Sequence, residues 1–392
     1  MRLTIKNENS FLGPLQKDLL MSNASSRAPK TSWVRVVIAA AGAAVAVAVI
    51  LLAFIWPTLT SSVQNLPLAI TGSAAQVKSV KTALHEKAPG TFTLTTVSTR
   101  AEAVKEIKRR DVYGAIVLTT RPEVLTASAN GTAVVQILDG VATEIQAKAN
   151  AAAQAGVAAA IAAHHAPAGT RAPTITVKVV DMVPLASKDS RGLGLSVAAF
   201  PLVLGGMLGG ILIALLVTGS WRRVTAVAIY SILGGVAAAA VMQGMFGVLQ
   251  GDFILTATAL TMAMAGTASF VVGMNALIGN PGIAVGSVIT TLIGNPLSAA
   301  TQPLQFLVPP WGEIGQWFVP GATTTLVRDL SYFPDANPTF VWLVLAGWVV
   351  VGLIATIGGH FRNRQDVRID HSVEGEGPHH PAHLDHPAHS AA

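Results

Sequence analysis

The stretch LIGNPGIAVGSVITTLIGNPLSAA, residues 277–300, contains no charged side chain and carries Ile-Gly-Asn-Pro twice, at residues 278–281 and 293–296. An apolar run of this length is compatible with three structures: a membrane crossing, a hairpin that enters a membrane and returns, and a surface loop. The choice fixes the side on which the C-terminus lies, and so it decides the fold. The duplication itself is also explained by chance in a low-complexity segment.

The composition of the whole chain indicates a membrane protein. Of 392 residues, 51% are hydrophobic and 12% are charged, whereas soluble domains carry about 25% charged residues. The chain has no cysteine, which excludes disulfides, iron–sulfur clusters, thiolate zinc sites and a cysteine nucleophile. The net charge of +6 is modest for this length, so the positions of the charges matter more than their sum.

Five other runs are long and apolar enough to cross a bilayer. A helix over residues 36–56 would be about 31 Å long, close to the roughly 30 Å hydrocarbon core. It lies too far from the N-terminus for an ordinary signal peptide, so we expect a retained signal anchor. The other four runs contain no lysine, arginine or glutamate and cover residues 193–218, 224–249, 253–274 and 339–357.

Basic residues orient these runs, because lysine and arginine near the ends of spans favour the cytoplasmic side. They occur before the first run, after the second and after the last: Lys30, Arg35, Arg222, Arg223, Arg362, Arg364 and Arg368. All three groups fall on the cytoplasmic side only if residues 277–300 cross. We therefore predict six spans in a cell (inner) membrane, with both termini cytoplasmic.

The predicted sixth crossing is short. We expect a helix over residues 281–298, because Pro281 suits the first turn of a helix, where its missing N–H costs nothing. Pro296 would kink the last turn of this helix. Gly282, Gly286 and Gly294 allow close approach of a neighbouring helix.

The spans divide the chain into parts. We predict a cytoplasmic segment 1–32, a first transmembrane helix 33–57, an extracytoplasmic α/β domain 58–191, a five-span bundle 192–360 with an outer loop 301–338, and a disordered His-rich cytoplasmic tail 361–392. The fold class is an α-helical polytopic membrane protein with six spans and an α/β domain inserted between spans one and two. The basic residues of the domain do not oppose this, because long domains translocate regardless of charge.

Within residues 58–191, strand and helix patterns alternate. Strands are expected over residues 66–71, 91–98, 112–119, 123–129 and 174–183, and helices over residues 74–87, 100–111 and 132–163. In the last helix, Val134, Leu138, Val141 and Ile145 recur at helical spacing and define one apolar face. Such alternation is typical of a small α/β sandwich.

Two motifs give the chain a family likeness. AVKEIKRRDVYGAIVLT (103–119) and VPGATTTLVRDLSYF (319–333) resemble stretches of the phage-infection-protein branch of the ABC type-2 exporter permeases. The matching residues are Val112, Tyr113, Gly114 and Ala115 in the first motif, and Pro320, Gly321, Ala322, Arg328, Tyr332 and Phe333 in the second. The order of one span, an α/β domain and five spans is also similar, and the likeness covers about residues 33–360.

The resemblance implies a permease half that forms a homodimer among membrane lipids, works with a separate ATPase subunit, and moves a hydrophobic or amphipathic substrate outward. The sequence departs from the family in the turn between the second and third spans, residues 219–223, where such exporters usually present a coupling helix. Trp221, Arg222 and Arg223 are the candidate contact with the ATPase, and the alternative is that both arginines only set topology.

Two functions therefore stay open. The size of the bundle, larger than an anchor needs, favours the export permease. The short cytoplasmic turn favours a non-transporting binding or scaffold protein of the cell envelope, which acts through its α/β domain. Nothing in the sequence names a substrate.

The outer loop combines charged and aromatic residues. We expect Glu313, Arg328 and Asp329 to pair where interface helices pack over the bundle, which is a structural role, and substrate contact is the alternative. The candidate residues of the loop motif are Pro320, Gly321, Arg328, Asp329, Tyr332 and Phe333.

The sequence contains no motif that is typical of an enzyme active site. No Gly-Lys pair occurs, so there is no Walker A loop, and there are no paired carboxylates and no zinc-peptidase motif. We expect no enzyme activity, no cofactor and no nucleic-acid partner. His379, His380, His383 and His386 form a tract of the kind that binds zinc or nickel, and a disordered tail explains them as well.

Overall fold

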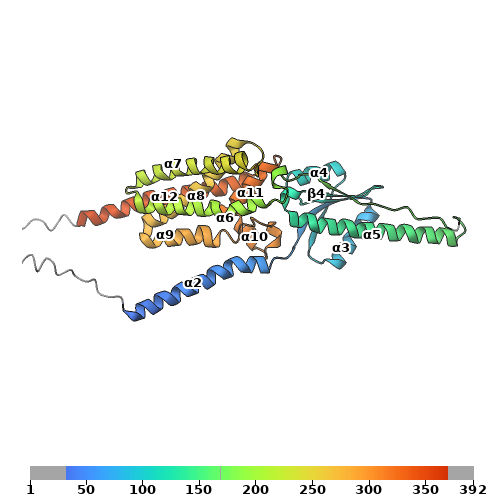
Figure 1. The fold of residues 1–392 in the computed structure, drawn as a ribbon, viewed down its shortest axis with the longest axis horizontal. Coiled ribbons are helices and arrows are strands. Elements are labelled where there is room, and N and C mark those ends of the chain that lie inside the picture. The colour runs from blue at the N-terminus through green and yellow to red at the C-terminus, as the bar shows by residue number, and fades with distance from the viewer. Residues whose placement is uncertain (1–31, 168, 370–392) are drawn as a thin grey trace, which may run out of the picture. The chain divides into compact units, whose positions relative to one another are not determined.

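The structure, a computed structural model, describes residues 32–167 and 169–369 (Figure 1). The histidine tract of the C-terminal tail and the expected cytoplasmic segment before Ser32 lie outside these residues. The chain divides after Leu52 into two compact units. The first unit contains most of helix α2, Trp33–Leu59, and the second contains all the other elements.

Among the described residues, five helices are long and apolar enough to cross a membrane. They are α2, α6 (Leu193–Leu216), α7 (Ser220–Ala239, continued by a π-helical turn to Met245), α8 (Phe253–Ile278) and α12 (Thr339–Ile369). The chain is therefore a helical multi-pass membrane protein. The apolar span in α2 is Trp33–Pro57, as predicted, and the helix itself continues two residues further to Leu59.

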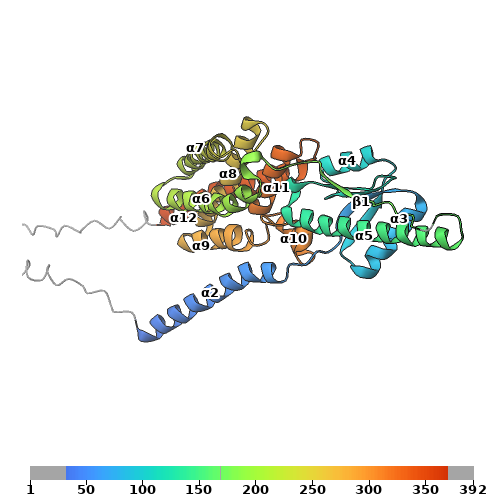
Figure 2. The same cartoon turned by 45° about the vertical axis from the view of Figure 1, so that its right-hand side comes forward.

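Helix α8 is the most buried of the five, and Figures 1 and 2 show it among α6, α7 and α12. Glycines bring these neighbours close to its backbone. A Cβ added at Gly235 of α7 would lie 2.2 Å from Thr261 Oγ1, and one added at Gly352 of α12 would lie 2.3 Å from Ser269 Oγ. Close backbone approach at small residues is the usual basis of helix packing in membranes.

Residues 277–300 contain a helix that is shorter than expected. Helix α9 (Asn280–Ser287) continues as a π-helix over Val288–Ile293, with Pro281 in its first turn as predicted. The helix ends before Pro296, so the predicted extent to residue 298 and the predicted kink are wrong. The chain turns at residues 294–297 instead.

Gly282, Gly286 and Gly294 lie against other segments, as predicted. A Cβ at Gly282 would lie 2.0 Å from the carbonyl oxygen of Met274 near the end of α8, and one at Gly294 would lie 3.1 Å from Pro320 Cδ. Eighteen residues after Gly282, the Ala300 carbonyl accepts a hydrogen bond from Ser196 Oγ at 3.3 Å, in the first turn of α6. The segment therefore runs from the C-terminal end of α8 to the N-terminal end of α6.

The α/β domain is built on a five-stranded sheet in the order β2-β1-β3-β4-β5. The strands are β1 (Leu66–Gly72), β2 (Phe92–Thr96), β3 (Ala115–Leu118), β4 (Glu123–Thr126) and β5 (Lys178–Asp181). β1 is parallel to β2 and β3, β3 and β4 are antiparallel, and β4 is parallel to β5. Helices α3 (Ala74–Lys87), α4 (Arg100–Lys108) and α5 (Thr132–Ala162) connect the parallel strands.

Side-chain alternation along β1 gives the sheet two apolar faces. Ala69 packs in a cluster with Ala103 and Ile107 of α4. Ile70 packs on the opposite face with Val77 of α3 and Val141 of α5. Figures 1 and 2 accordingly show α4 on one side of the sheet, with α3 and α5 on the other. The predicted strand–helix alternation therefore forms a three-layer arrangement.

The last strand is shorter than the predicted 174–183. The backbone N–H groups of Ile175 and Val177 donate to Asn150 Oδ1 at 2.7 Å and to Gln146 Oε1 at 3.0 Å, both on α5. Residues 174–177 therefore bond to a helix instead of a strand, and pairing with β4 begins only at Lys178.

Candidate functional site: the junction between the α/β domain and helix α11

The expected outer loop, residues 301–338, contains a largely buried helix, α11 (Val319–Tyr332), which follows the short helix α10 (Trp311–Gly315). Pro320 lies in the first turn of α11, where it leaves no N–H unpaired. A Cβ at Gly321 would lie 2.2 Å from the carbonyl oxygen of Gly315, so only glycine allows α10 to pack this closely. Pro320 and Gly321 therefore shape the loop and bring no reactive group.

An ion pair joins the α/β domain to α11. Arg110 Nη1 donates to Asp329 Oδ1, and the two side chains are 12% and 8% exposed. Arg110 Nε also donates to Asn130 Oδ1 at 3.1 Å, and the guanidinium lies 5.4 Å from the centre of the Phe333 ring. One side chain of the domain thus contacts an acid and an aromatic ring that follow it by more than 200 residues.

The backbone at Arg110 is left-handed, with φ of 60°. Arg110 lies just past the C-cap residue of α4, a position where glycine is most common because it has no Cβ to clash. An arginine here carries a conformational cost of order 1 kcal/mol or more. The contacts of its side chain offset that cost.

The sequence-based pairing in the outer loop is wrong. We expected Glu313, Arg328 and Asp329 to pair with one another, but the partner of Asp329 is Arg110. Among the described residues, neither Glu313 nor Arg328 forms an ion pair, and Arg328 Nη2 donates to the Ala300 carbonyl at 3.2 Å. The correct pair has no local signal, because its two members lie on different domains.

Burial changes the acid–base behaviour of this cluster. Burial raises the pKa of the Asp329 carboxyl, and the Arg110 guanidinium opposes that shift. Burial and the nearby Arg110 lower the pKa of Arg328 to about 10, so Arg328 stays protonated at neutral pH. Burial also raises the pKa of the Tyr113 hydroxyl, which is therefore neutral. The junction holds two cations beside the Asp329 carboxyl.

Tyr332 and Phe333 extend the contact from the end of α11. Tyr332 Oη donates to the Val248 carbonyl at 2.6 Å, in the loop between α7 and α8. Phe333 is 1% exposed and packs in the same apolar cluster as Ile107 of α4 and Leu125 of β4. The end of α11 therefore inserts into the core of the α/β domain.

Two cavities adjoin the junction and share Ser196 and Thr301 in their lining. The smaller, about 40 Å³, is lined by Arg328, Asp189 and Tyr332 together with the first residues of α5. The larger, about 210 Å³, lies between the last turns of α2, the first turns of α6 and residues 295–302. Its lining combines rings and aliphatic groups with amides and hydroxyls and contains no charged side chain.

The candidate coupling residues lie elsewhere, at the start of α7. Because α7 begins at Ser220, the turn after α6 is residues 217–219, which is shorter than the predicted 219–223. Arg223 folds back to donate to the carbonyls of Ala214 and Val217, at 2.8 Å each. Trp221 is 70% exposed, and Arg222 is also exposed. Of the three candidate coupling residues, Trp221 and Arg222 are therefore accessible at the protein surface.

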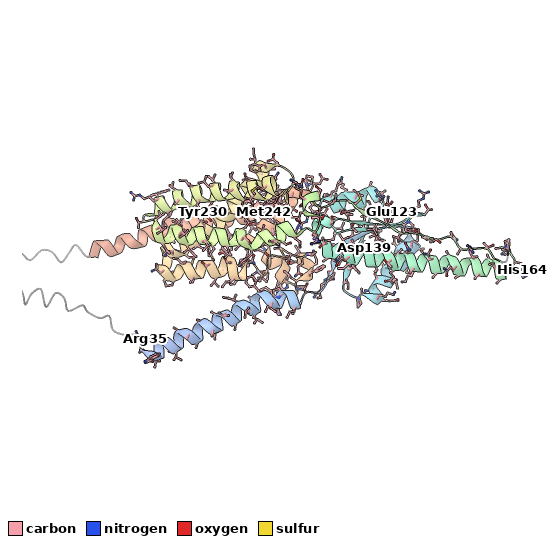
Figure 3. The ribbon with its side chains drawn as sticks, viewed as in Figure 1. Arg35, Glu123, Asp139, His164, Tyr230 and Met242 are labelled. Carbon is pink, nitrogen blue, oxygen red and sulfur yellow. The ribbon has the colours of Figure 1, made fainter. Side chains whose placement is uncertain are left out.

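No metal site is evident in the part of the chain that the structure describes. No group of three or more histidine, aspartate or glutamate side chains is placed to hold a metal ion there. His164 and His165 follow the far end of α5, where Figure 3 labels His164, and both are exposed. His379, His380, His383 and His386 are not among the described residues.

In comparisons with protein-family models, curated proteins and solved structures, none matched this chain. The fold and the junction define a helical multi-pass membrane protein that carries an α/β domain. Any more specific function is inferred from its own residues.

Proposed function

We propose that this chain is a six-span permease subunit of the ABC type-2 exporter kind, which moves a hydrophobic or amphipathic substrate outward. The main support is the pocket of about 210 Å³ beside α2 and α6. Its apolar side includes Phe54 and Phe200, and its polar side includes Asn295 and Gln302. A pocket with both characters at the end of a membrane bundle suits a molecule that has both characters.

The contact between α11 and the α/β domain supports six crossings. Because Arg110 pairs with Asp329, the domain and α11 share one side of the membrane. Helix α8 leads away from that side, so the chain after Ile278 has to return to it. The helix Asn280–Ile293 covers about 21 Å of this path, and the non-helical residues 294–300 extend it.

Labelling of single cysteines tests the six crossings, and the native chain has no cysteine to interfere. Cysteines at Ser190 and Asp335, both exposed, should react with an impermeant maleimide added from outside. Cysteines at Thr218 and Gln365 should react only after the membrane is permeabilised. External labelling at Gln365 together with protection at Asp335 would mean that residues 279–300 do not cross.

The alternative is a non-transporting binding or scaffold protein of the cell envelope. It is favoured by the cytoplasmic turn of residues 217–219, which leaves no room for a coupling helix. The exposed Trp221 and Arg222 are the remaining candidates for contact with an ATPase. Homodimerisation and an ATPase partner stay predictions from the family resemblance.

Substitution at the start of α7 separates the two functions. If an ATPase docks there, Trp221→Ala should reduce its co-purification about tenfold, because exposed tryptophans are common hot spots of binding. Arg222→Lys keeps the charge and topology but loses the planar donors, and a smaller reduction is expected. Ser220→Ala is the matched control, because Ser220 precedes Trp221 in the first turn of α7 and its replacement removes no large side chain. Normal expression with unchanged co-purification and export in both variants would favour the scaffold.

A further inference from the structure

We infer that the two cavities at the junction form one binding site for an anionic amphiphile. The anionic group lies beside Arg328, and the apolar part lies between the last turns of α2 and the first turns of α6. The inference names the substrate class of the proposed exporter, so the statement that the bound molecule is exported rests on the proposed function. Binding itself requires no transport and is tested without it.

The smaller cavity provides a cation with free donors. A guanidinium has five N–H donors, and among the described residues Arg328 uses one hydrogen bond, to the Ala300 carbonyl. It is half-buried, forms no ion pair there and remains charged at neutral pH. The volume of about 40 Å³ exceeds the 10–15 Å³ that one water requires. A compact carboxylate or phosphate oxygen group suits this cavity.

A second source of positive potential faces the same cavity. Helix α5 is 31 residues long and begins after Gly131 without a side-chain cap. Gly131 and Thr132 line the cavity with Arg328. The first N–H groups of a helix lack partners within the helix and carry partial positive charge, which favours an anion.

The Asp189 side chain also lines the smaller cavity, but its carboxylate oxygens accept hydrogen bonds from the start of α6. Its Oδ1 accepts from the N–H of Leu193 at 3.0 Å, and its Oδ2 accepts from the N–H of Gly194 at 2.8 Å. Asp189 thus caps the start of α6. Since Asp329 is likewise paired with Arg110, both nearby acids are engaged, and Arg328 remains available to a ligand.

The larger cavity fits the rest of an amphiphile. Phe54 and Phe200 contact each other edge-on with ring centres 6.2 Å apart, and both line it together with Ala199. Ser196 and Thr301 line both cavities and place hydroxyl groups between the cation and the rings. The order from Arg328 through hydroxyls to rings matches an anionic headgroup, an ester or glycerol region, and an acyl chain.

The test uses the full chain in phosphatidylcholine vesicles that contain a trace of photoactivatable phosphatidylglycerol or photoactivatable phosphatidylcholine. The phosphatidylglycerol probe should label the peptides that contain Phe54 and Phe200 about tenfold more than the phosphatidylcholine probe, because both lipids carry a phosphate but the choline cation of phosphatidylcholine would be repelled by Arg328 and the helix N-terminus. Arg328→Gln should abolish that preference. Arg191→Gln, the same charge change at an exposed neighbouring site, should preserve it.

A second variant keeps the test decisive if Arg328→Gln fails to fold. Thr301 is exposed and lines both cavities, so Thr301→Trp should leave the fold intact and block labelling by obstructing the passage. Equal labelling by both probes, or an unchanged preference in Arg328→Gln, overturns the proposal. Loss of the preference in millimolar inorganic phosphate would mean a site for small free anions and would also overturn it. The vesicles contain no ATPase, so a failure of export leaves these results unaffected.

Discussion

Replacing Asp329 by asparagine is expected to reduce the free energy of unfolding by about 3–5 kcal/mol, because it leaves the buried Arg110 guanidinium without its counter-charge. Detergent-driven unfolding in mixed micelles, followed by circular dichroism, measures the loss. Asp335→Asn is the matched control. Asp335 is exposed two residues beyond Phe333, and its replacement should cost less than about 0.5 kcal/mol.

The double variant Arg110→Met with Asp329→Leu should recover most of this loss. Burial raises the pKa of Asp329 in spite of its cationic partner, which indicates that desolvation opposes the ion pair. Apolar side chains of similar volume avoid that desolvation, and such replacements are often neutral or stabilising. If Asp329→Asn proves no more harmful than Asp335→Asn, the ion pair does not hold the junction.

Replacing Phe333 by alanine should destabilise the junction by a similar amount, about 3–5 kcal/mol, because it opens a cavity in the core of the α/β domain. The ring also loses its contact with the Arg110 guanidinium. Because Phe333 comes from the membrane bundle, its loss should also loosen the domain from α11. Limited proteolysis should then cleave between the domain and the bundle several times faster.

Phe340→Ala provides the control for the aromatic ring. Phe340 is 43% exposed and stacks edge-on against Trp317 with ring centres 5.0 Å apart. Its loss should cost roughly 0.5–1.5 kcal/mol, the usual range for an aromatic pair, and should leave proteolysis unchanged. Equal effects of the two substitutions on proteolysis would contradict a specific role for Phe333.

Elements with local signals were predictable from the sequence. Helix α3 has the predicted bounds of residues 74–87, and Ser73 and Gln76 form a capping box that marks its start. In α5, the predicted apolar face is buried at Val134, Leu138 and Val141. A capping residue and the apolar face of a helix both depend on residues within a few positions of one another, so these features can be predicted from the sequence alone.

The parts that were wrong depend on contacts between distant segments. The partner of Asp329 lies 219 positions away, and no periodicity links the two residues. Residues 174–177 have a strand-like pattern, but two of their backbone N–H groups donate to Asn150 and Gln146 of α5 and not to a neighbouring strand. Arg223 was expected in a turn, but it lies in the first turn of α7, and its side chain donates to a carbonyl in the last turn of α6 and to that of the residue after α6. Tertiary contacts decide such positions.

The glycine contacts of α8 limit where a large molecule can move. The cavity lined by α6, α8 and α11 has a volume of about 20 Å³, room for one water and far too small for an acyl chain. In the described part of the bundle, this cavity offers no passage for an acyl chain between α6, α8 and α11. If the chain exports an amphiphile as proposed, the acyl chain would therefore have to travel along the lipid-facing surface of the helices and not through the space between α6, α8 and α11.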